Sequence, residues 1–125
     1  MRVLVCGGRY FDSAEAFNWL EANAHDLVAE MMGKRAGVEI DTVIHGGATG
    51  ADEGADQWAR SEGMKVLAFP ADWKKHGRAA GPIRNQRMID EGRPDAVIAF
   101  HGGRGTADMI RRAEIAGLRV LRVVS

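Results

Sequence analysis

Three glycine-rich turns are the part of this sequence whose residue types could do chemistry. Each follows a short apolar run, and they read Gly7-Gly8-Arg9, Gly46-Gly47-Ala48-Thr49-Gly50 and Gly102-Gly103-Arg104-Gly105-Thr106. Glycine lets the backbone approach an anion closely and form a nest of amide groups. A helix that begins directly after such a turn adds unpaired N–H groups and a partial positive charge. The three turns therefore predict a site for a phosphate or a carboxylate.

The alternative for any one turn is that its glycines simply allow a tight connection between a strand and a helix. For a single turn we weigh the two interpretations evenly. None of the turns has the G-x-G-x-x-G spacing of dinucleotide-binding folds or the G-x-x-x-x-G-K-[ST] spacing of P-loops. Three such turns at one edge of a sheet are a stronger indication than any one of them.

Arginine side chains could clamp the anion. Arg84 falls in the first turn of a predicted helix, where a guanidinium can hold a phosphate through two parallel hydrogen bonds. Asn85 is its neighbour, and Arg9 follows the first glycine pair. The alternative is a solvated surface arginine, which we weigh more heavily for Arg87 than for Arg84.

Asp52 and Asp108 are the candidate carboxylates. Asp52 could accept hydrogen bonds from ribose hydroxyls or stabilise the first turn of its own helix, whereas for Asp108 the helix-start role is favoured. His45 and His101 each end a strand beside a glycine pair, but no third ligand has the spacing of a metal site. We therefore expect local hydrogen bonds for both histidines and no metal. With no Ser-His-Asp order or nucleophile elbow in the sequence, no catalytic residue is assigned.

The hydrophobic pattern predicts the elements that must position these residues. Short β-branched or apolar runs predict five strands, at residues 3–6, 42–45, 66–69, 96–100 and 120–124. Helix-length segments separate them, which predicts βαβ units and a mainly parallel sheet with helices on both faces. In a doubly wound sheet the ligand crevice lies where the strand order reverses, here between the first and fourth strands. The turn at 7–9 should then lie beside the turn at 102–106.

Helical periodicity predicts four helices, at residues 13–35, 51–62, 81–92 and 106–116. Gly33 or Gly37 is expected to end the first helix, and Thr49 to cap the second. Pro82 is expected at the first position of the third helix, because proline is preorganised there. Residues 70–80 form one long polar connection in this interpretation.

Length and composition limit the class of protein. The chain has 125 residues, of which 46% are hydrophobic, and this suits one domain spanning residues 1–125. Its 17 basic and 17 acidic side chains give no net charge, which argues against nucleic acid as a partner. No apolar run approaches the roughly 18 residues of a membrane span, and a single cysteine, Cys6, excludes a disulfide scaffold. We expect a cytoplasmic protein without a membrane partner.

The glycine and arginine blocks together resemble a known family. Gly7-Gly8-Arg9, the run from His45 to Asp52, Gly81-Pro82-x-Arg84-Asn85-x-x-Met88 and Gly102-Gly103-x-Gly105-Thr106 look like the YspA/CpYpsA-related branch of the SLOG superfamily. The resemblance covers nearly the whole chain, from Val3 to near Val123. It implies a Rossmann-like, doubly wound α/β domain that binds nucleotides or nucleotide-derived ligands.

The same superfamily contains the LOG-type phosphoribohydrolases, which cleave the N-glycosidic bond of nucleoside 5′-monophosphates, and the DNA-processing protein DprA. The hydrolases carry Arg-Lys-x-x-Met followed by Pro-Gly-Gly-x-Gly-Thr-x-x-Glu. Here Asn85 replaces the lysine, His101 replaces the proline, and Met109 stands where the glutamate that carries the chemistry should be. This departure argues against hydrolysis, and Asp52 or Asp108 is the alternative carboxylate.

Three functions follow, in order of preference. The first is binding of a small nucleotide-derived ligand, which the protein could sense as a signal. The second is phosphoribohydrolase activity, and a weaker third is single-stranded DNA binding. The predicted nucleotide- and phosphate-binding residues are Gly7, Gly8, Arg9, Gly46, Gly47, Ala48, Thr49, Gly50, Asp52, Arg84, Asn85, Gly102, Gly103, Gly105 and Thr106.

No cofactor is predicted for this chain. Relatives of this family usually form dimers, so the resemblance implies a homodimer or a higher homo-oligomer. Trp19, Met31 and Met32 are large apolar side chains of the first helix that could supply the face between copies. The alternative is that these residues simply cover the sheet.

Overall fold

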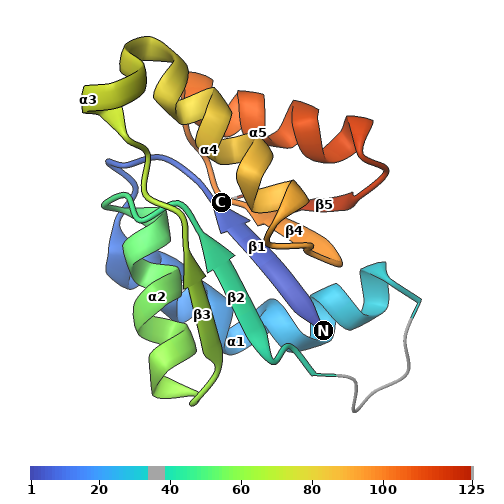
Figure 1. The fold of residues 1–125 in the computed structure, drawn as a ribbon. Helices are drawn as coiled ribbons and strands as arrows, with labels where there is room; N and C mark the ends of the chain where they lie inside the picture. Colours follow the sequence, from blue (N-terminus) through green and yellow to red (C-terminus); the bar gives the residue numbers. More distant parts are fainter. Residues whose placement is uncertain (34–38, 125) are drawn as a thin grey trace.

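The computed structural model describes residues 1–33 and 39–124. Within these residues, five strands form one sheet, and they are β1 (Arg2–Cys6), β2 (Thr42–His45), β3 (Lys65–Ala68), β4 (Ala96–Ala99) and β5 (Arg119–Arg122). Every pairing is parallel and the order is β3-β2-β1-β4-β5, so the order reverses between β1 and β4 (Figure 1). This confirms the predicted α/β, Rossmann-like, doubly wound sheet, and the strand bounds agree with the prediction to within two residues.

Helices cover both faces of the sheet. On one face lie α1 (Ser13–Met31) and α2 (Ala51–Ser61), and on the other lie α4 (Ala80–Asp90) and α5 (Arg104–Ile115) (Figure 1). Two short elements, α3 (Trp73–His76) and the 3₁₀ turn η1 (Gly77–Ala79), lead into α4 beyond the carboxyl ends of the strands. The chain therefore winds in opposite directions from β1, as the reversal of strand order requires.

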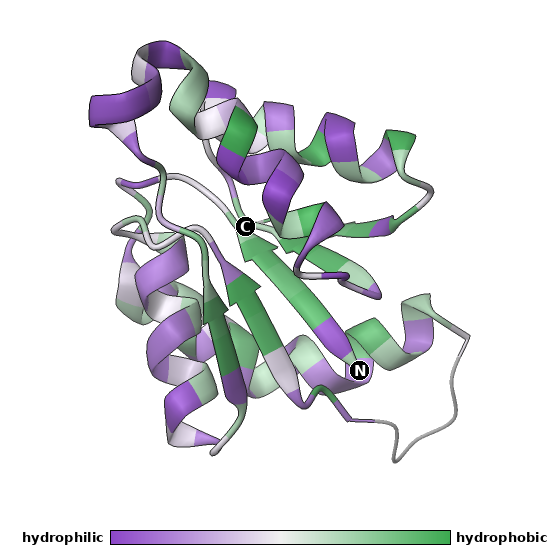
Figure 2. Ribbon diagram, viewed as in Figure 1, coloured by the Kyte–Doolittle hydropathy of each residue, from purple (hydrophilic) through white to green (hydrophobic). Residues whose placement is uncertain are grey.

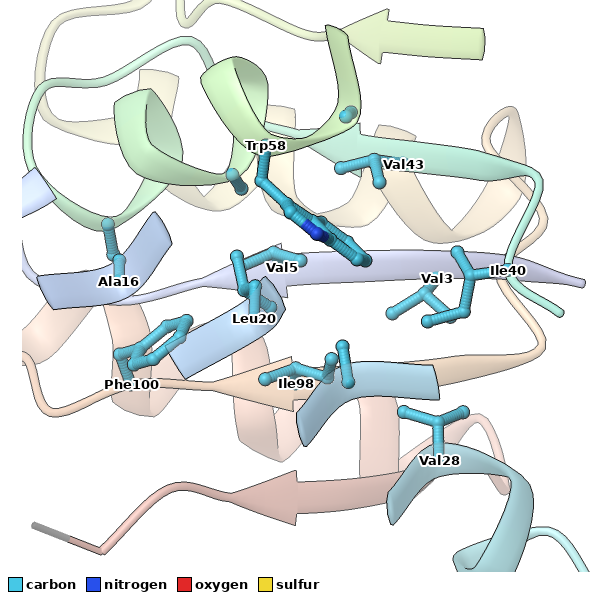
Figure 3. Close-up of a cluster of buried hydrophobic side chains, with 14 of the residues drawn as sticks. Val3, Val5, Ala16, Leu20, Val28, Ile40, Val43, Trp58, Ile98 and Phe100 are labelled. Carbon is cyan, nitrogen blue, oxygen red and sulfur yellow. The ribbon is translucent and has the colours of Figure 1, made fainter. Parts of the chain in front are cut away.

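Alternate residues of each strand form two separate cores. Val3 and Val5 of β1 pack under α1 and α2, while Leu4 and Cys6 pack under α4 and α5. The strands are therefore hydrophobic on both faces, and hydrophilic residues are concentrated in the helices and loops (Figure 2). Trp58 of α2 is fully buried at the centre of the first core (Figure 3).

Several predicted helix bounds were wrong. α1 ends at Met31, because Gly33 follows it with a φ of 67°; residues 35 and 37, named in the prediction, lie outside the described residues. α4 begins at Ala80, so Pro82 is its third residue, still within the first turn where a missing N–H costs nothing. α5 begins at Arg104, two residues before the predicted start.

The connection predicted at 70–80 is partly helical. Asp72 accepts a hydrogen bond of 3.1 Å from the Lys75 amide and so caps the single turn of α3. A turn of four residues is too short to show helical periodicity, so the hydrophobic pattern missed it.

The side chains predicted as a face between copies contact the core of their own chain. The Trp19 ring packs edge-on against Phe100 with 5.6 Å between ring centroids, and Met31 and Met32 border the same core. They therefore cover the sheet, which was the alternative interpretation, and the homo-oligomer remains a prediction without this support. Among the described residues no helix is long and apolar enough to cross a membrane.

Candidate functional site

A cleft of about 810 Å³ opens at the carboxyl edge of the sheet, where the order of the strands reverses. Most of the predicted site residues line it, and they are Gly7, Gly8, Arg9, Ala48, Asp52, Arg84, Asn85, Gly102, Gly103, Gly105 and Thr106. Gly46, Gly47, Thr49 and Gly50 were predicted with them but are not part of its lining. The topology therefore brings the first and third glycine turns and the start of α4 to one place.

The first and third glycine turns touch each other directly. The Gly8 amide donates a hydrogen bond of 2.9 Å to the carbonyl oxygen of His101. A Cβ atom at Gly102 would collide with the Thr106 hydroxyl and lie 2.7 Å from the Gly8 nitrogen. Only glycine allows this approach, and the contact confirms that the two turns lie side by side.

The amino terminus of α5 faces the cleft without a cap. Its N-cap residue is Gly103, and no side chain among the described residues accepts a hydrogen bond from its first amides. Gly103, Arg104 and Gly105 line the cleft. Because the first amides of a helix have no partner within the helix, this end can receive an anion.

The second glycine turn is arranged differently, because its amides are already used. The amides of Gly46 and Ala48 donate to Asp52 Oδ2, at 3.1 and 3.2 Å, and the Gly47 amide donates to His45 Nδ1 at 2.9 Å. His45 thus makes the local hydrogen bond to the backbone that its sequence position predicted. This turn is folded around a carboxylate of its own chain.

Thr49 and Gly50 brace the first turn. The Thr49 hydroxyl donates to the Arg9 carbonyl oxygen at 2.9 Å and does not cap α2, so the predicted cap was wrong. The N-cap is Gly50, with a φ of 77°, and a Cβ atom there would collide with the Gly8 carbonyl oxygen. The close fit of the two loops therefore depends on glycine at this position.

Asp52 is an almost buried carboxylate at the cleft. Its side chain is 6% exposed, and its Oδ1 atom accepts no hydrogen bond from the described residues. Burial raises the pKa of Asp52, although the amide of Ala48 and the charge of Arg84 oppose this. The open oxygen can accept a hydrogen bond from a ligand.

Arg84 is held with part of its guanidinium unused. Its Nη1 atom donates to the Gly46 carbonyl oxygen at 2.7 Å, and its Nε atom donates to Asn85 Oδ1 at 3.0 Å. Its Nη2 atom makes no hydrogen bond to the described residues, and the side chain lines the cleft. Partial burial lowers the pKa of Arg84, against the effect of Asp52, but an arginine remains charged.

Asn85 joins α4 to α5. Its amide group donates to the Gly105 carbonyl oxygen at 3.2 Å and to Asp108 Oδ2 at 3.0 Å, so both donor positions are used. Asp108 also accepts from Arg111 and Arg112. Partial burial opposes ionisation of Asp108, but these hydrogen bonds outweigh it and lower its pKa. The carboxylate of Asp108 is therefore ionised and occupied by the contacts that join the two helices.

The cleft also contains residues that were not among the predicted binding residues. Tyr10, Phe11 and Glu15 form its α1 side, and Met109 is 1% exposed and lines it where the hydrolases have their glutamate. Burial raises the pKa of Cys6 to about 12, so its thiol is not an ionised nucleophile. The position of 10–15 directly after the first glycine turn was the signal that could have placed Tyr10 and Glu15 here. No group of three potential metal ligands occurs in the described residues.

Comparison with known proteins shows which family the chain is similar to. The chain is 45% identical over 86 residues to the Gene 61 protein of Mycobacterium phage D29, an alignment that covers 63% of this chain and 68% of the phage protein. The sequence model of the YspA, cpYpsA-related SLOG family matches residues 1–76, which hold the first two glycine turns and Asp52. The chain belongs to the YspA, cpYpsA-related SLOG family.

Proposed function

We propose that the cleft binds a small nucleotide-derived ligand. Its phosphate lies on the first amides of α5 beside Arg84, and a ribose hydroxyl donates to Asp52 Oδ1. The observation that carries the proposal is that one cleft joins an uncapped helix amino terminus to an almost buried carboxylate with an open oxygen. A phosphorylated sugar is complementary to both.

The charge distribution supports one orientation of this ligand. A phosphate would be repelled by Asp52, whereas the amides of Gly103, Arg104 and Gly105 and the unused edge of Arg84 attract it. Hydroxyl groups donate to carboxylates, so the ribose belongs on the Asp52 side. Because Asp52 interrupts the basic lining, the cleft suits a small ligand better than a long polyanion.

Calorimetry with a panel of mononucleotides, dinucleotides and cyclic nucleotides tests the proposal. We expect binding to at least one of them, weakened about 10- to 100-fold by Arg84→Ala, since this removes a charge-assisted hydrogen bond. Asp52→Asn should also weaken binding. Lys65→Ala is the matched control, because Lys65 begins β3 at the opposite edge of the sheet and is exposed. A folded protein that binds no member of the panel contradicts the proposal.

Phosphoribohydrolase activity is a second candidate, and the observation that favours it is that Asp52, an almost buried carboxylate whose Oδ1 atom accepts no hydrogen bond from the described residues, lines the cleft. In that reaction the bond between ribose C1′ and the base nitrogen breaks with its electron pair going to the base. Water adds its oxygen and one hydrogen to C1′ as a hydroxyl group, and its other proton goes to the departing base. Asp52 would stabilise the positive charge that develops on the ribose. Chromatographic detection of free base from AMP, GMP or CMP, abolished by Asp52→Asn, tests this candidate.

A further inference from the structure

The α1 side of the cleft has features that neither the phosphate nor the ribose explains. It consists of the loop between β1 and α1 and the first turn of α1, with Tyr10, Phe11, Asp12 and Glu15 in the lining. One of these side chains is an aromatic ring without packing, and another is a carboxylate without a partner.

Tyr10 lies on a turn that is firmly held, and yet its side chain packs on almost nothing. The Phe11 amide donates to the Gly8 carbonyl oxygen at 3.1 Å, and the Thr49 hydroxyl fixes the Arg9 carbonyl. The Phe11 ring is anchored against Phe100 with 5.1 Å between ring centroids. Tyr10, between these fixed neighbours, is 95% exposed. The turn therefore places an exposed aromatic ring in the lining of the cleft. Because its backbone is already held by hydrogen bonds, a ligand that stacks on Tyr10 loses little free energy to ordering the turn.

Glu15 is the unpartnered carboxylate of the same wall. The Asp12 Oδ1 atom accepts a hydrogen bond of 3.0 Å from the Glu15 amide, and Asp12 so caps α1. The Glu15 side chain itself makes no hydrogen bond or ion pair with the described residues. Its carboxylate remains an acceptor in the lining of the same cleft as Tyr10.

We propose that this wall is a nucleobase subsite that selects bases carrying an exocyclic amino group. The base stacks on Tyr10, and its amino group donates to Glu15. Adenine and cytosine offer such a donor, whereas hypoxanthine and uracil place a carbonyl oxygen at the same position, which a carboxylate repels. The inference rests on the proposed function, because the phosphate and ribose must occupy the other side of the cleft.

The stacking role is tested with AMP and ribose 5-phosphate, which share the phosphate and sugar but differ in the base. The wild-type protein should bind AMP more tightly than ribose 5-phosphate. Tyr10→Ala should weaken AMP binding about 10- to 100-fold, the usual effect of removing one stacked aromatic ring, and leave ribose 5-phosphate unchanged. Tyr10→Phe should retain tight AMP binding. Trp73→Ala is the control, because Trp73 is also exposed but lies outside the cleft lining.

The selective role of Glu15 is tested with the pairs AMP and IMP, and CMP and UMP. The wild-type protein should prefer AMP over IMP and CMP over UMP. Glu15→Gln should reduce both preferences, because a glutamine amide donates to a carbonyl as readily as it accepts from an amino group. Glu21→Gln, an exposed change on the same helix outside the cleft, should leave the preferences intact.

The outcomes separate this inference from the proposed function. Tight binding of AMP that Tyr10→Ala does not weaken overturns the stacking role while the proposed function stands. If the wild-type protein binds AMP and IMP with equal affinity, and CMP and UMP with equal affinity, the selection for an exocyclic amino group is overturned. A folded wild-type protein that binds neither the nucleotides nor ribose 5-phosphate contradicts the proposed function and the subsite together.

Discussion

The Gly46 amide donates a hydrogen bond of 3.1 Å to Asp52 Oδ2, so the glycine turn after β2 is closed around a carboxylate of its own chain. The same oxygen accepts a hydrogen bond from the Ala48 amide, and the Gly46 carbonyl oxygen accepts one from the Arg84 guanidinium. Three elements of the site (the turn after β2, α2 and α4) are therefore fixed by one small network. The network leaves one carboxylate oxygen and one guanidinium edge available.

The almost complete burial of Asp52 predicts a pH effect on stability. Since burial raises its pKa above 3.8, the folded protein holds the proton more tightly than the unfolded chain. The stabilisation of the folded protein by this proton is fully present below the ordinary pKa of an aspartate. It is lost as the pH rises through the pKa that Asp52 has in the folded protein. Each tenfold difference in proton affinity is worth about 1.4 kcal/mol. Urea unfolding between pH 4 and about 8 should show Asp52→Asn gaining stability relative to the wild type as the pH rises.

The comparison of the two proteins isolates Asp52, because contributions of Asp56, Glu91 and Asp108 are common to both. Glu53→Gln provides the control, since Glu53 is the exposed neighbouring carboxylate on α2. Its stability should run parallel to that of the wild type at every pH. If Asp52→Asn also ran parallel to the wild type, the carboxylate would not be destabilised by burial.

The close fit between the first two turns predicts an unusual cost for one added methyl group. Gly50 and Gly63 have similar φ angles, 77° and 71°, but a Cβ at Gly50 would collide with the Gly8 carbonyl oxygen, whereas one at Gly63 meets nothing within 4 Å. Gly63→Ala should cost about 1–2 kcal/mol for the backbone strain alone. Gly50→Ala should cost about 3 kcal/mol or more, because the collision adds to the strain of a backbone whose ψ of −122° lies outside the left-handed helical region. Chemical denaturation of both variants measures the difference, and equal costs would mean that the loops move apart without penalty.

The location of the site could be predicted from the sequence, but not all of the hydrogen bonds within it. That Gly8 lies beside His101 follows from two rules: parallel strands end at one edge, and the crevice forms where their order reverses. Arg84 lies at the same cleft, as expected, because its helix begins at that edge of the sheet. These expectations depend only on topology, which periodicity and glycine positions determine well.

The details that depend on the exact path of a loop could not be predicted. Asp52 was weighed as an acceptor for ribose hydroxyls or as a helix-start carboxylate, and Thr49 was expected to be a cap. In the structure Asp52 accepts a hydrogen bond from the Ala48 amide of the preceding turn, and Thr49 donates to the Arg9 carbonyl oxygen. Both contacts join segments whose separation in space is unknown until the loops are built. Tyr10 and Glu15 belong to no ligand-binding motif, and their position directly after the first glycine turn is the one sequence signal that they lie at the cleft.

The bridge between α4 and α5 predicts that Asn85 matters for stability. Asn85 is 3% exposed and makes hydrogen bonds to Arg84, Gly105 and Asp108. Asn85→Ala should lower the free energy of unfolding by about 1–3 kcal/mol, because buried partners lose their hydrogen bonds. Asn18→Ala, at an exposed position of α1, should change it little. Urea unfolding measures both, and an equally small effect at Asn85 would mean that water replaces the lost partners.

The ring of Trp58 fills the centre of the core under α1 and α2 (Figure 3). Its Nε1 atom is buried and has no hydrogen-bond partner in the described part of the chain. Trp58→Phe removes this unsatisfied donor, which offsets part of the loss of packing, so we expect a cost of about 1–2 kcal/mol. Trp58→Ala removes the same donor but leaves a much larger cavity, so it should cost about 3–5 kcal/mol.

Urea unfolding of the two Trp58 variants measures these costs, with Trp73→Phe as a control for the loss of an exposed indole. The control should change stability by less than about 0.5 kcal/mol, because a half-exposed ring contributes little packing. A cost for Trp58→Phe well above about 2 kcal/mol would show that the indole N–H is satisfied, most simply by a buried water. In that case its loss would add to the loss of packing instead of offsetting it.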